Sequence, residues 1–351
     1  MNSRLSKVRS FFNQHKIDAL LVVNDIDVRY LSQYPTASES WLLVTPKKAY
    51  YLTDFRYFHE VRKSLKSIKP VLYHGSIYKS LFEIMAADNI QRIGFNENHW
   101  SLYRFKQLQS QCPKAMRLIE ANTLIESLRE IKEPGEIAMI RKGLSIHERA
   151  LKYIKRYIKP NISEKEVLHK LESFIRSENV TFSFSPIIAS GPNSSYPHAH
   201  VTIRKIRDNE PVLVDMGVDL NGYKTDLTRM FFLGKISNLV KEISAHVYEA
   251  QQRAIAVIRD GVDISEVDLK ARKYLESKKL DKYFGHSLGH GVGLEIHESP
   301  RIYHTNNKPL KSGMVVTVEP AVYLSGKFGI RLEEMVLVKK KGCEVLSGNI
   351  H

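Results

Sequence analysis

Residues 284–298 constrain this chain more than any other stretch, because three histidines and four glycines are crowded into it. The histidines are His286, His290 and His297, and the glycines surround the middle one. Glycine lets the backbone bend and approach other groups where a Cβ would clash. Neutral imidazole is the commonest metal ligand and is suited to proton transfer near neutral pH. The stretch is either a functional site or a flexible loop with incidental histidines, and carboxylates elsewhere in the chain favour the site.

Length and composition indicate two domains of an ordinary soluble protein. The chain has 351 residues, of which 43% are apolar and 26% are charged. No apolar run is long enough to span a bilayer, and the N-terminus lacks the features of a signal peptide. The two cysteines, Cys112 and Cys343, are expected to be reduced thiols of a cytoplasmic protein.

The net charge of +15 is high enough to suit an anionic partner. However, the lysines and arginines are scattered, and the strongest run is only Lys339-Lys340-Lys341. Neither zinc-finger spacing nor an RNA-binding aromatic motif is present. We therefore expect neither nucleic acid nor a membrane as a partner.

The first part of the chain is predicted to be a small α/β domain. Apolar residues at helical spacing alternate there with short apolar runs that are typical of strands. The expected helices are 3–16, 57–67, 76–88 and 100–111, and the expected strands are 19–23, 41–44, 49–52, 92–95 and 116–119. This alternation predicts a mixed sheet covered by helices.

A charged stretch that begins after residue 125 and ends in Pro134-Gly135 marks the expected domain boundary. Pro134 and the acidic residues beside it fit the first turn of a long helix at about 135–158. Ser163 with Glu166 three residues later forms a capping box, which predicts a helix at about 163–178. We expect two domains, residues 1–125 and residues 126–351.

Two aspartates are expected to meet on a hairpin. Residues 211–218 and 223–232 are predicted to be its strands. Folded about a midpoint just after Leu220, the hairpin places Asp215 directly opposite Asp226. Two carboxylates so near each other, among apolar residues, would be costly unless a cation joins them.

Carboxylates recur near the C-terminus. Glu319 ends one predicted strand, and Glu333 and Glu334 begin another. Adjacent strand residues point to opposite faces, so only one of the latter pair can join Glu319, and periodicity alone leaves the choice open. Four carboxylates and one imidazole suit two divalent ions of the Mn²⁺, Co²⁺ or Zn²⁺ kind. Such a pair activates water and polarises a carbonyl, so the implied chemistry is amide hydrolysis.

Six short motifs occur in order between residues 126 and 345. They are Asp215-x-Gly217, Tyr223-x-x-Asp226-x-Thr228-Arg229, Gly289-His290-Gly291-Val292-Gly293, His297-Glu298-x-Pro300-Arg301, Val318-Glu319-Pro320-x-x-Tyr323 and Gly329-Ile330-Arg331-x-Glu333. This set resembles the pita-bread metallopeptidases, specifically the aminopeptidase P and prolidase branch. The resemblance implies an α+β pita-bread catalytic domain, and residues 1–125 resemble the creatinase-type N-terminal domain of the same branch.

The resemblance also implies a ligand set for two divalent metals per subunit, with Mn²⁺ expected before Co²⁺ or Zn²⁺. The implied ligands are Asp215, Asp226, His290, Glu319 and Glu333, with Asp226 and Glu333 bridging. The Gly-Ile-Arg-x-Glu motif selects Glu333 over Glu334 as the ligand.

Further residues match positions that act on the substrate. His198 matches the histidine that steadies the substrate and the tetrahedral intermediate, His297 matches its partner across the cleft, and His286 matches a third histidine in the pocket. Arg331 and Arg301 match positions that support the metal shell or meet the charged end of the substrate. Glu319 is also expected to accept the proton of the attacking water.

Three departures from the usual family pattern leave the ligand set intact. Ala321 stands where glycine is usual, and Glu334 stands where aspartate is common. After His198 the chain reads Ala-His200-Val-Thr, where proline often precedes the threonine. His200 is therefore a weaker site candidate than His198.

The resulting expectation is an Xaa-Pro aminopeptidase that releases the N-terminal residue of proline-containing peptides. Prolidase, which cleaves Xaa-Pro dipeptides, is the alternative within the branch. Methionine aminopeptidases lack such an N-terminal domain, and creatinase lacks the ligands that are complete here. An alternative of another class is a non-catalytic module on the same fold that binds peptides or nucleic acid. A homodimer is expected from the resemblance.

Overall fold

The computed structural model describes residues 3–35 and 39–348, and the chain forms two compact units, residues 1–129 and 130–351. The first unit extends beyond the expected boundary near 125 because α7 (Leu124–Glu130) packs into it. Arg129 at the end of α7 pairs with the buried Asp27, with 2.8 Å between Nη1 and Oδ1. Along the described parts of the chain, every helix is too short or too polar to cross a membrane.

The N-terminal unit is built on a six-stranded sheet with the order β4-β3-β2-β1-β5-β6. Its strands are β1 (Ala19–Val22), β2 (Trp41–Val44), β3 (Ala49–Thr53), β4 (Lys69–Leu72), β5 (Arg92–Phe95) and β6 (Arg117–Glu120). The β1–β2 and β2–β3 pairs are antiparallel and the other pairs are parallel, so the sheet is mixed, as predicted. The five strands expected from apolar runs are present, and β4 is an additional parallel edge strand.

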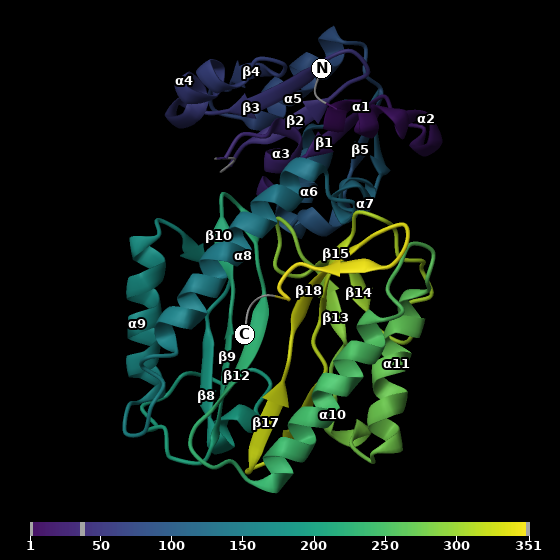
Figure 1. Cartoon of the computed structure of the whole chain (residues 1–351). Coiled ribbons are helices and arrows are strands. Elements are labelled where there is room, and N and C mark those ends of the chain that lie inside the picture. The colour runs from purple at the N-terminus through teal and green to yellow at the C-terminus, as the bar shows by residue number, and fades with distance from the viewer. Residues whose placement is uncertain (1–2, 36–38, 349–351) are drawn as a thin grey trace. The chain divides into compact units, whose positions relative to one another are not determined.

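Helices cover this sheet (Figure 1). They are α1 (Ser3–Ser10), α2 (Phe12–His15), α3 (Asp25–Ser32), α4 (Phe55–Ser64), α5 (Ile77–Ala87) and α6 (Leu102–Gln111), with the short 3₁₀ turn η1 (Glu97–His99). Leu81 and Met85 of α5 and Leu108 of α6 are fully buried against strand residues that include Trp41 and Ile93. Burial of this apolar face is the main stabilising contribution to the unit.

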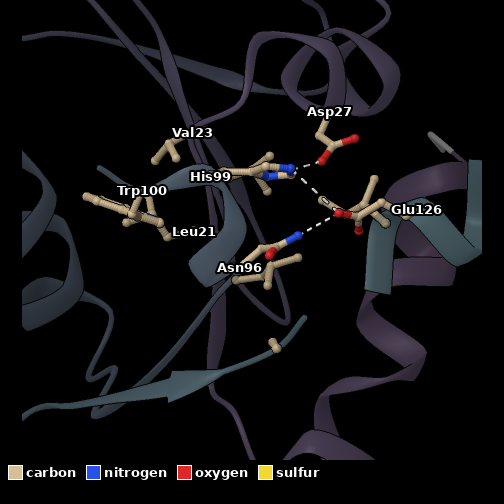
Figure 2. A pocket seen from close by; sticks show the side chains of 11 residues that line it. Leu21, Val23, Asp27, Asn96, His99, Trp100 and Glu126 are labelled. Carbon is tan, nitrogen blue, oxygen red and sulfur yellow. Dashed lines mark hydrogen bonds and ion pairs between the residues drawn. The ribbon is translucent and has the colours of Figure 1, made fainter. Parts of the chain in front are cut away.

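A polar cluster lies beside the apolar core of the N-terminal unit (Figure 2). His99 lies between two carboxylates, with Nδ1 3.7 Å from Asp27 Oδ2 and Nε2 3.6 Å from Glu126 Oε1. Asn96 Nδ2 donates to the same oxygen of Glu126 at 2.5 Å, and the other oxygen of Asp27 accepts from Arg129. Because the two carboxylates face opposite nitrogens of one ring and each already accepts from a donor, the cluster forms an internal network that joins α3, η1 and α7.

The second unit contains two helix pairs and several short sheets. Its helices are α8 (Pro134–Ile154), α9 (Glu164–Ser177), α10 (Asn238–Ile255) and α11 (Ile264–Ser277), with 3₁₀ turns η2 (Gly191–Ser195) and η3 (Asp281–Tyr283). Its first strands are β7 (Thr181–Phe182), β8 (Ile187–Ser190), β9 (Pro211–Met216), β10 (Val218–Leu220), β11 (Tyr223–Lys224) and β12 (Leu227–Phe232). The later strands are β13 (Gly289–Gly291), β14 (Glu298–Ile302), β15 (Val315–Val318), β16 (Ala321–Leu324), β17 (Phe328–Arg331), β18 (Glu334–Val338) and β19 (Cys343–Val345).

Alternation along the central strands of this unit divides its core in two. The sheets have the orders β12-β9-β8, β14-β13-β15-β18-β19, β16-β17 and β11-β10-β7. On β15, Val315 belongs to the core under α8 and α9, whereas Val316 and Val318 belong to the core under α10 and α11. Strand side chains alternate between faces, so this sheet serves both helix pairs. Figure 1 shows the two pairs on opposite flanks of the strands, which is the pita-bread arrangement.

Local signals explain where the first helix pair begins. Pro134 is the first residue of α8, where its missing N–H costs no helical hydrogen bond. Ser163 and Glu166 form the predicted capping box at the start of α9, with Glu166 N donating to Ser163 Oγ at 3.2 Å. The helices α10 and α11 were not predicted, although Ser237 caps α10 in the usual way by accepting from Val240 N.

Candidate active site

The carboxylates and the histidine expected to bind metal are brought together from distant parts of the second unit. Each lies on a strand or within a residue or two of a strand end, and the five are Asp215 on β9, Asp226 before β12, His290 on β13, Glu319 after β15 and Glu333 before β18. Ligand atoms of Asp215, Asp226 and Glu333 lie within 4.8 Å of one another, and so do those of His290, Glu319 and Glu333. Glu333 therefore belongs to both groups.

The hairpin that carries the aspartates has a register different from the predicted one. Asp215 lies opposite Thr228, and the same register places Asp226 opposite Gly217, so the prediction that the aspartates oppose each other directly was wrong. The turn is centred on Asn221 and Gly222, which have φ values of 51° and 83°, as a two-residue Asn-Gly hairpin turn requires. The shift is two residues, which preserves the face of each side chain, and the two carboxylates still meet.

Glycines allow β13 to carry His290 against its neighbours. A Cβ at Gly289 would lie 2.0 Å from the carbonyl oxygen of Thr317, and one at Gly291 would lie 2.3 Å from that of Ser299. These approaches fix His290, whose backbone N–H donates to Thr317 Oγ1 at 3.1 Å. The glycines on both sides of His290 are thus required by close packing.

The carboxylate cluster is crowded, and burial and mutual repulsion perturb it. Burial, reinforced by neighbouring carboxylates, raises the pKa of Asp226 and of Glu333 well above their usual range. Burial also raises the pKa of Asp215, against the opposing charge of Arg331. At Glu319 burial acts in the same direction, but the hydrogen bond from His290 and nearby positive charges hold its pKa below the usual value.

Two oxygens of the cluster lack a hydrogen-bond partner. Asp215 Oδ1 and Glu333 Oε1 are buried without one. Buried polar atoms in native proteins are nearly always paired, and a cation is the kind of partner that orphaned carboxylate oxygens among like charges would fit. His290 Nε2 adds a nitrogen ligand atom 3.5 Å from Asp226 Oδ2 and 3.4 Å from Glu319 Oε1. Four carboxylates and one imidazole at these separations fit a pair of divalent metal ions.

Arg331 is held directly behind the cluster. It is 4% exposed, and its Nη2 donates to Asp215 Oδ2 at 2.5 Å. Nε donates to Thr228 Oγ1 at 2.9 Å, and Nη1 donates to Tyr323 OH at 2.6 Å. Thr228 Oγ1 in turn donates to Glu333 Oε2 at 2.9 Å. Thr228 and Tyr323 were not predicted as site residues, although both occur in the quoted motifs.

The side chains of the adjacent Glu333 and Glu334 point in opposite directions, as alternation along a strand requires. Glu333 is 2% exposed and faces the cluster. Glu334 pairs with Val318 in the β15–β18 ladder, and its side chain bonds to Arg229 at 3.0 Å, away from the cluster. Glu333 therefore stands among the candidate ligands and Glu334 does not.

Two of the predicted histidines lie beside the cluster. The ring of His297 stands edge-on to that of His290, with 4.2 Å between centroids. Burial lowers the pKa of His297, as does the nearby His290, so its imidazole is neutral at physiological pH. His286 Nε2 lies 3.2 Å from Tyr323 OH, and burial likewise lowers the pKa of His286.

A cleft of about 1310 Å³ opens over these groups. The five candidate ligands, His198, His200, His286, His297, Arg301 and Arg331 all line it. His198, His297 and Arg301 are exposed, as groups that meet a substrate must be. Apolar side chains that include Phe182, Phe184 and Ile187 line the cleft as well, and sequence reasoning did not foresee them.

Two models of known protein families match the chain. A family model described as "Metallopeptidase family M24" matches residues 138–340, and one described as "Creatinase/Prolidase N-terminal domain" matches residues 4–131. The chain is 33% identical to the uncharacterized peptidase YqhT of Bacillus subtilis, over 97% of this chain and 96% of that protein.

Two solved structures resemble the chain over nearly its whole length. The Xaa-Pro dipeptidase from Bacillus anthracis superposes with a TM-score of 0.95 at 33% identity, covering 99% of this chain and 97% of its own. The X-Pro aminopeptidase from Thermotoga maritima superposes with a TM-score of 0.89, also at 33% identity, covering 95% and 96%.

Proposed function

The chain belongs to metallopeptidase family M24, in its Xaa-Pro peptidase branch, and we propose that it hydrolyses the bond before proline in Xaa-Pro dipeptides. The observation that carries hydrolysis is the buried cluster of four carboxylates and His290, with two orphaned oxygens. The intact ligand set and family membership oppose the alternative of a non-catalytic binding module.

Asp215, Asp226, His290, Glu319 and Glu333 would hold two divalent cations. Bound there, the cations would lower the pKa of a water molecule and polarise the substrate carbonyl. Mn²⁺ is the expected metal, because oxygen donors dominate the set. Arg331 fixes the orientation of Asp215 by a charge-assisted hydrogen bond.

Protons and charge are handled by side chains that face the cleft. Glu319, whose pKa lies below its usual value, is ionised and accepts the proton of the attacking water at a carboxylate oxygen. His297 and His198 line the cleft, where each would donate an N–H to the oxyanion that develops on the substrate carbonyl. The proton held by Glu319 then passes to the proline nitrogen as the peptide bond breaks.

Arg301 supports the preference for dipeptides. Its side chain is exposed in the cleft four residues after His297, and no carboxylate among the described residues pairs with its guanidinium. A guanidinium in that position suits the free carboxylate that ends an Xaa-Pro dipeptide. This proposal departs from the preference for aminopeptidase P that we drew from the sequence.

Cleavage of longer peptides, as by aminopeptidase P, is the second candidate. The cleft volume of about 1310 Å³ exceeds what a dipeptide fills, which favours it. The test is hydrolysis of Ala-Pro and Ala-Pro-Ala by metal-stripped protein before and after addition of Mn²⁺. Metal-dependent cleavage of Ala-Pro alone supports the dipeptidase, and cleavage of Ala-Pro-Ala alone establishes the aminopeptidase.

A variant of Arg301 separates the two activities further. Arg301→Met should raise KM for Ala-Pro by about 10- to 100-fold, because it removes a hydrogen bond between charged groups. The control Arg259→Met removes an exposed arginine that does not line the cleft and should leave KM unchanged. Equal KM values for wild type and Arg301→Met would refute the role of this residue.

A further inference from the structure

His198 lies on a connection that is anchored at both ends to the start of α9. The connection runs from the end of β8 through η2 to residue 204. The anchor is Glu164, the first residue of α9, whose side chain is completely buried. None of the mechanistic roles described above involves this carboxylate, which does not line the cleft.

The Glu164 carboxylate accepts hydrogen bonds from both ends of the connection. At the near end, Oε1 accepts from the backbone N–H of Ser190 at 2.7 Å and from its Oγ at 2.9 Å. At the far end, Oε2 accepts from the backbone N–H of Thr202 at 3.1 Å and from its Oγ1 at 2.6 Å. Asn193 Nδ2 lies 3.1 Å from each oxygen. One carboxylate therefore holds both ends of this connection, and His198 lies in the free span, the residues between Ser190 and Thr202.

The backbone of α9 holds the same far end. Glu164 N donates to the carbonyl of Arg204 at 3.1 Å, and Lys165 N donates to that of Thr202 at 3.0 Å. These are N–H groups of the first helical turn, which have no partner within the helix. The positive end of the helix dipole also stabilises an anion at this position.

A buried carboxylate needs such compensation, and a second charge provides more. Arg204 Nη1 donates to Ser190 Oγ at 2.5 Å and to Glu210 Oε1 at 2.7 Å, so its guanidinium stands one hydrogen bond from Glu164. Bonds to an ionised group are about twice as strong as neutral ones. The carboxylate of Glu164 accepts from five donor atoms, whereas an amide in its place would turn its own N–H₂ toward some of them.

The free span is also held from the side of the cluster. Arg331 Nη1 donates to the carbonyl of Pro197 at 3.1 Å, and Gly329 N donates to Ser194 Oγ at 2.9 Å. The backbone directly before His198 is thus fixed between Glu164 on one side and the arginine that binds Asp215 on the other.

We propose that Glu164 is a positioning residue that fixes the connection 190–204 so that His198 stands over the carboxylate cluster. It contacts neither substrate nor metal, and it acts only through the loop it closes. The inference rests on the proposed function, in which His198 stabilises the oxyanion. An error of about 1 Å in the position of a catalytic group costs up to about 100-fold in rate.

The test compares Glu164→Gln with the matched control Glu166→Gln in the full-length, Mn²⁺-loaded protein. Both residues lie in the first turn of α9, but the side chain of Glu166 accepts from Ser163 in the capping box and not from the connection 190–204. Glu164→Gln should lower kcat/KM for the Xaa-Pro substrate by about 10- to 100-fold, mainly in kcat. Glu166→Gln should change it by less than about 2-fold, although it weakens the same helix end.

A double-mutant cycle with His198→Ala distinguishes positioning from general destabilisation. If Glu164 acts through His198, Glu164→Gln should cost less than about 3-fold once His198 is gone. An equal loss in both backgrounds, or full activity of Glu164→Gln, would overturn the proposal. If Glu164→Gln does not fold, Thr202→Val removes one donor from an exposed residue and should cost about 3- to 10-fold, and the same cycle then decides.

Hydrogen exchange keeps this test separate from the proposed function. The amides of Ser190 and Thr202 donate to Glu164, so Glu164→Gln should speed their exchange at least about 10-fold and Glu166→Gln should not. If the wild type cleaves no Xaa-Pro peptide, the proposed function fails, while this measurement still tests whether Glu164 holds the connection 190–204. Unchanged exchange of both amides would refute the claim that Glu164 holds the connection, whatever the activity.

Discussion

Replacing Lys132 by methionine should strongly destabilise the second unit. Lys132 Nζ lies 2.7 Å from Glu298 Oε1, and the two side chains are 1% and 7% exposed. At an effective dielectric constant of about 20, charges this close attract by roughly 6 kcal/mol. Desolvation offsets much of that attraction, but removing one partner leaves the other charge buried, which costs about 3–5 kcal/mol.

A double variant separates the loss of the attraction between the two charges from the cost of leaving one charge buried. Lys132→Met combined with Glu298→Gln removes both charges, so the buried charge disappears and stability should return to within about 2 kcal/mol of the wild type. Lys152→Met is the control, because Lys152 pairs with Glu148 in an exposed i,i+4 bridge. Its loss should cost roughly 0.5 kcal/mol or less.

The assay must report the second unit alone. Both tryptophans, Trp41 and Trp100, lie in the first unit, so their fluorescence does not follow the second. Urea unfolding of the metal-free protein should be followed by hydrogen exchange of peptides from residues 130–348. A loss below about 1 kcal/mol for Lys132→Met, or a double variant no more stable than the single one, would refute the reasoning.

Three further predictions concern pH, metal and glycine. Burial raises the pKa of Asp27 to about 6, so the folded protein binds this proton more tightly than the unfolded chain does. The free energy of unfolding should therefore fall by roughly 3 kcal/mol as pH rises from about 4 through 6. Unfolding followed by Trp41 and Trp100 fluorescence should show this loss in wild type and not in Asp27→Asn; identical pH profiles would contradict it. Chelation of the metal should abolish peptidase activity. Mn²⁺ at about 100 times its Kd should raise the free energy of unfolding of the second unit by about 2.7 kcal/mol. An unfolding midpoint that Mn²⁺ leaves unchanged would contradict this. Gly289→Ala should destabilise by about 1–3 kcal/mol, because its Cβ would meet a carbonyl oxygen at 2.0 Å, whereas Gly285→Ala has no atom within 4 Å and should be tolerated. Equal melting temperatures of these two variants would count against the packing argument.

Local patterns in the sequence were sufficient for much of the secondary structure. The capping box at Ser163 and the proline at position 134 mark helix starts that the structure places within a residue of the prediction. The hairpin register was missed by two residues, yet its signal was local. Asn221-Gly222 is the pair that favours a two-residue turn, and its φ values are positive in the structure. Read as the turn centre, this dipeptide predicts the observed register.

The site was only partly predictable, because its supporting contacts join residues far apart in the chain. Motif order identified the candidate ligands, but the choice between Glu333 and Glu334 depends on the pairing of Val318 with Glu334, which alternation within one strand cannot supply. Arg331 reaches Asp215 across more than a hundred residues. Glu164 carries no signal at all in a local window, since its partners lie on a connection that only the folded unit brings to it.

The distribution of the candidate ligands over the chain has a consequence for how the second unit holds together. Asp215 and Asp226 precede the connection 233–237, and the three other ligands follow it. A protein cut within that connection would carry an incomplete site on each fragment. Metal bound by the reassembled pair would then raise the affinity of the fragments for each other. By reciprocity, association of the fragments would raise the affinity for metal by the same factor. Metal affinity in this unit is therefore also a measure of how firmly its two halves adhere.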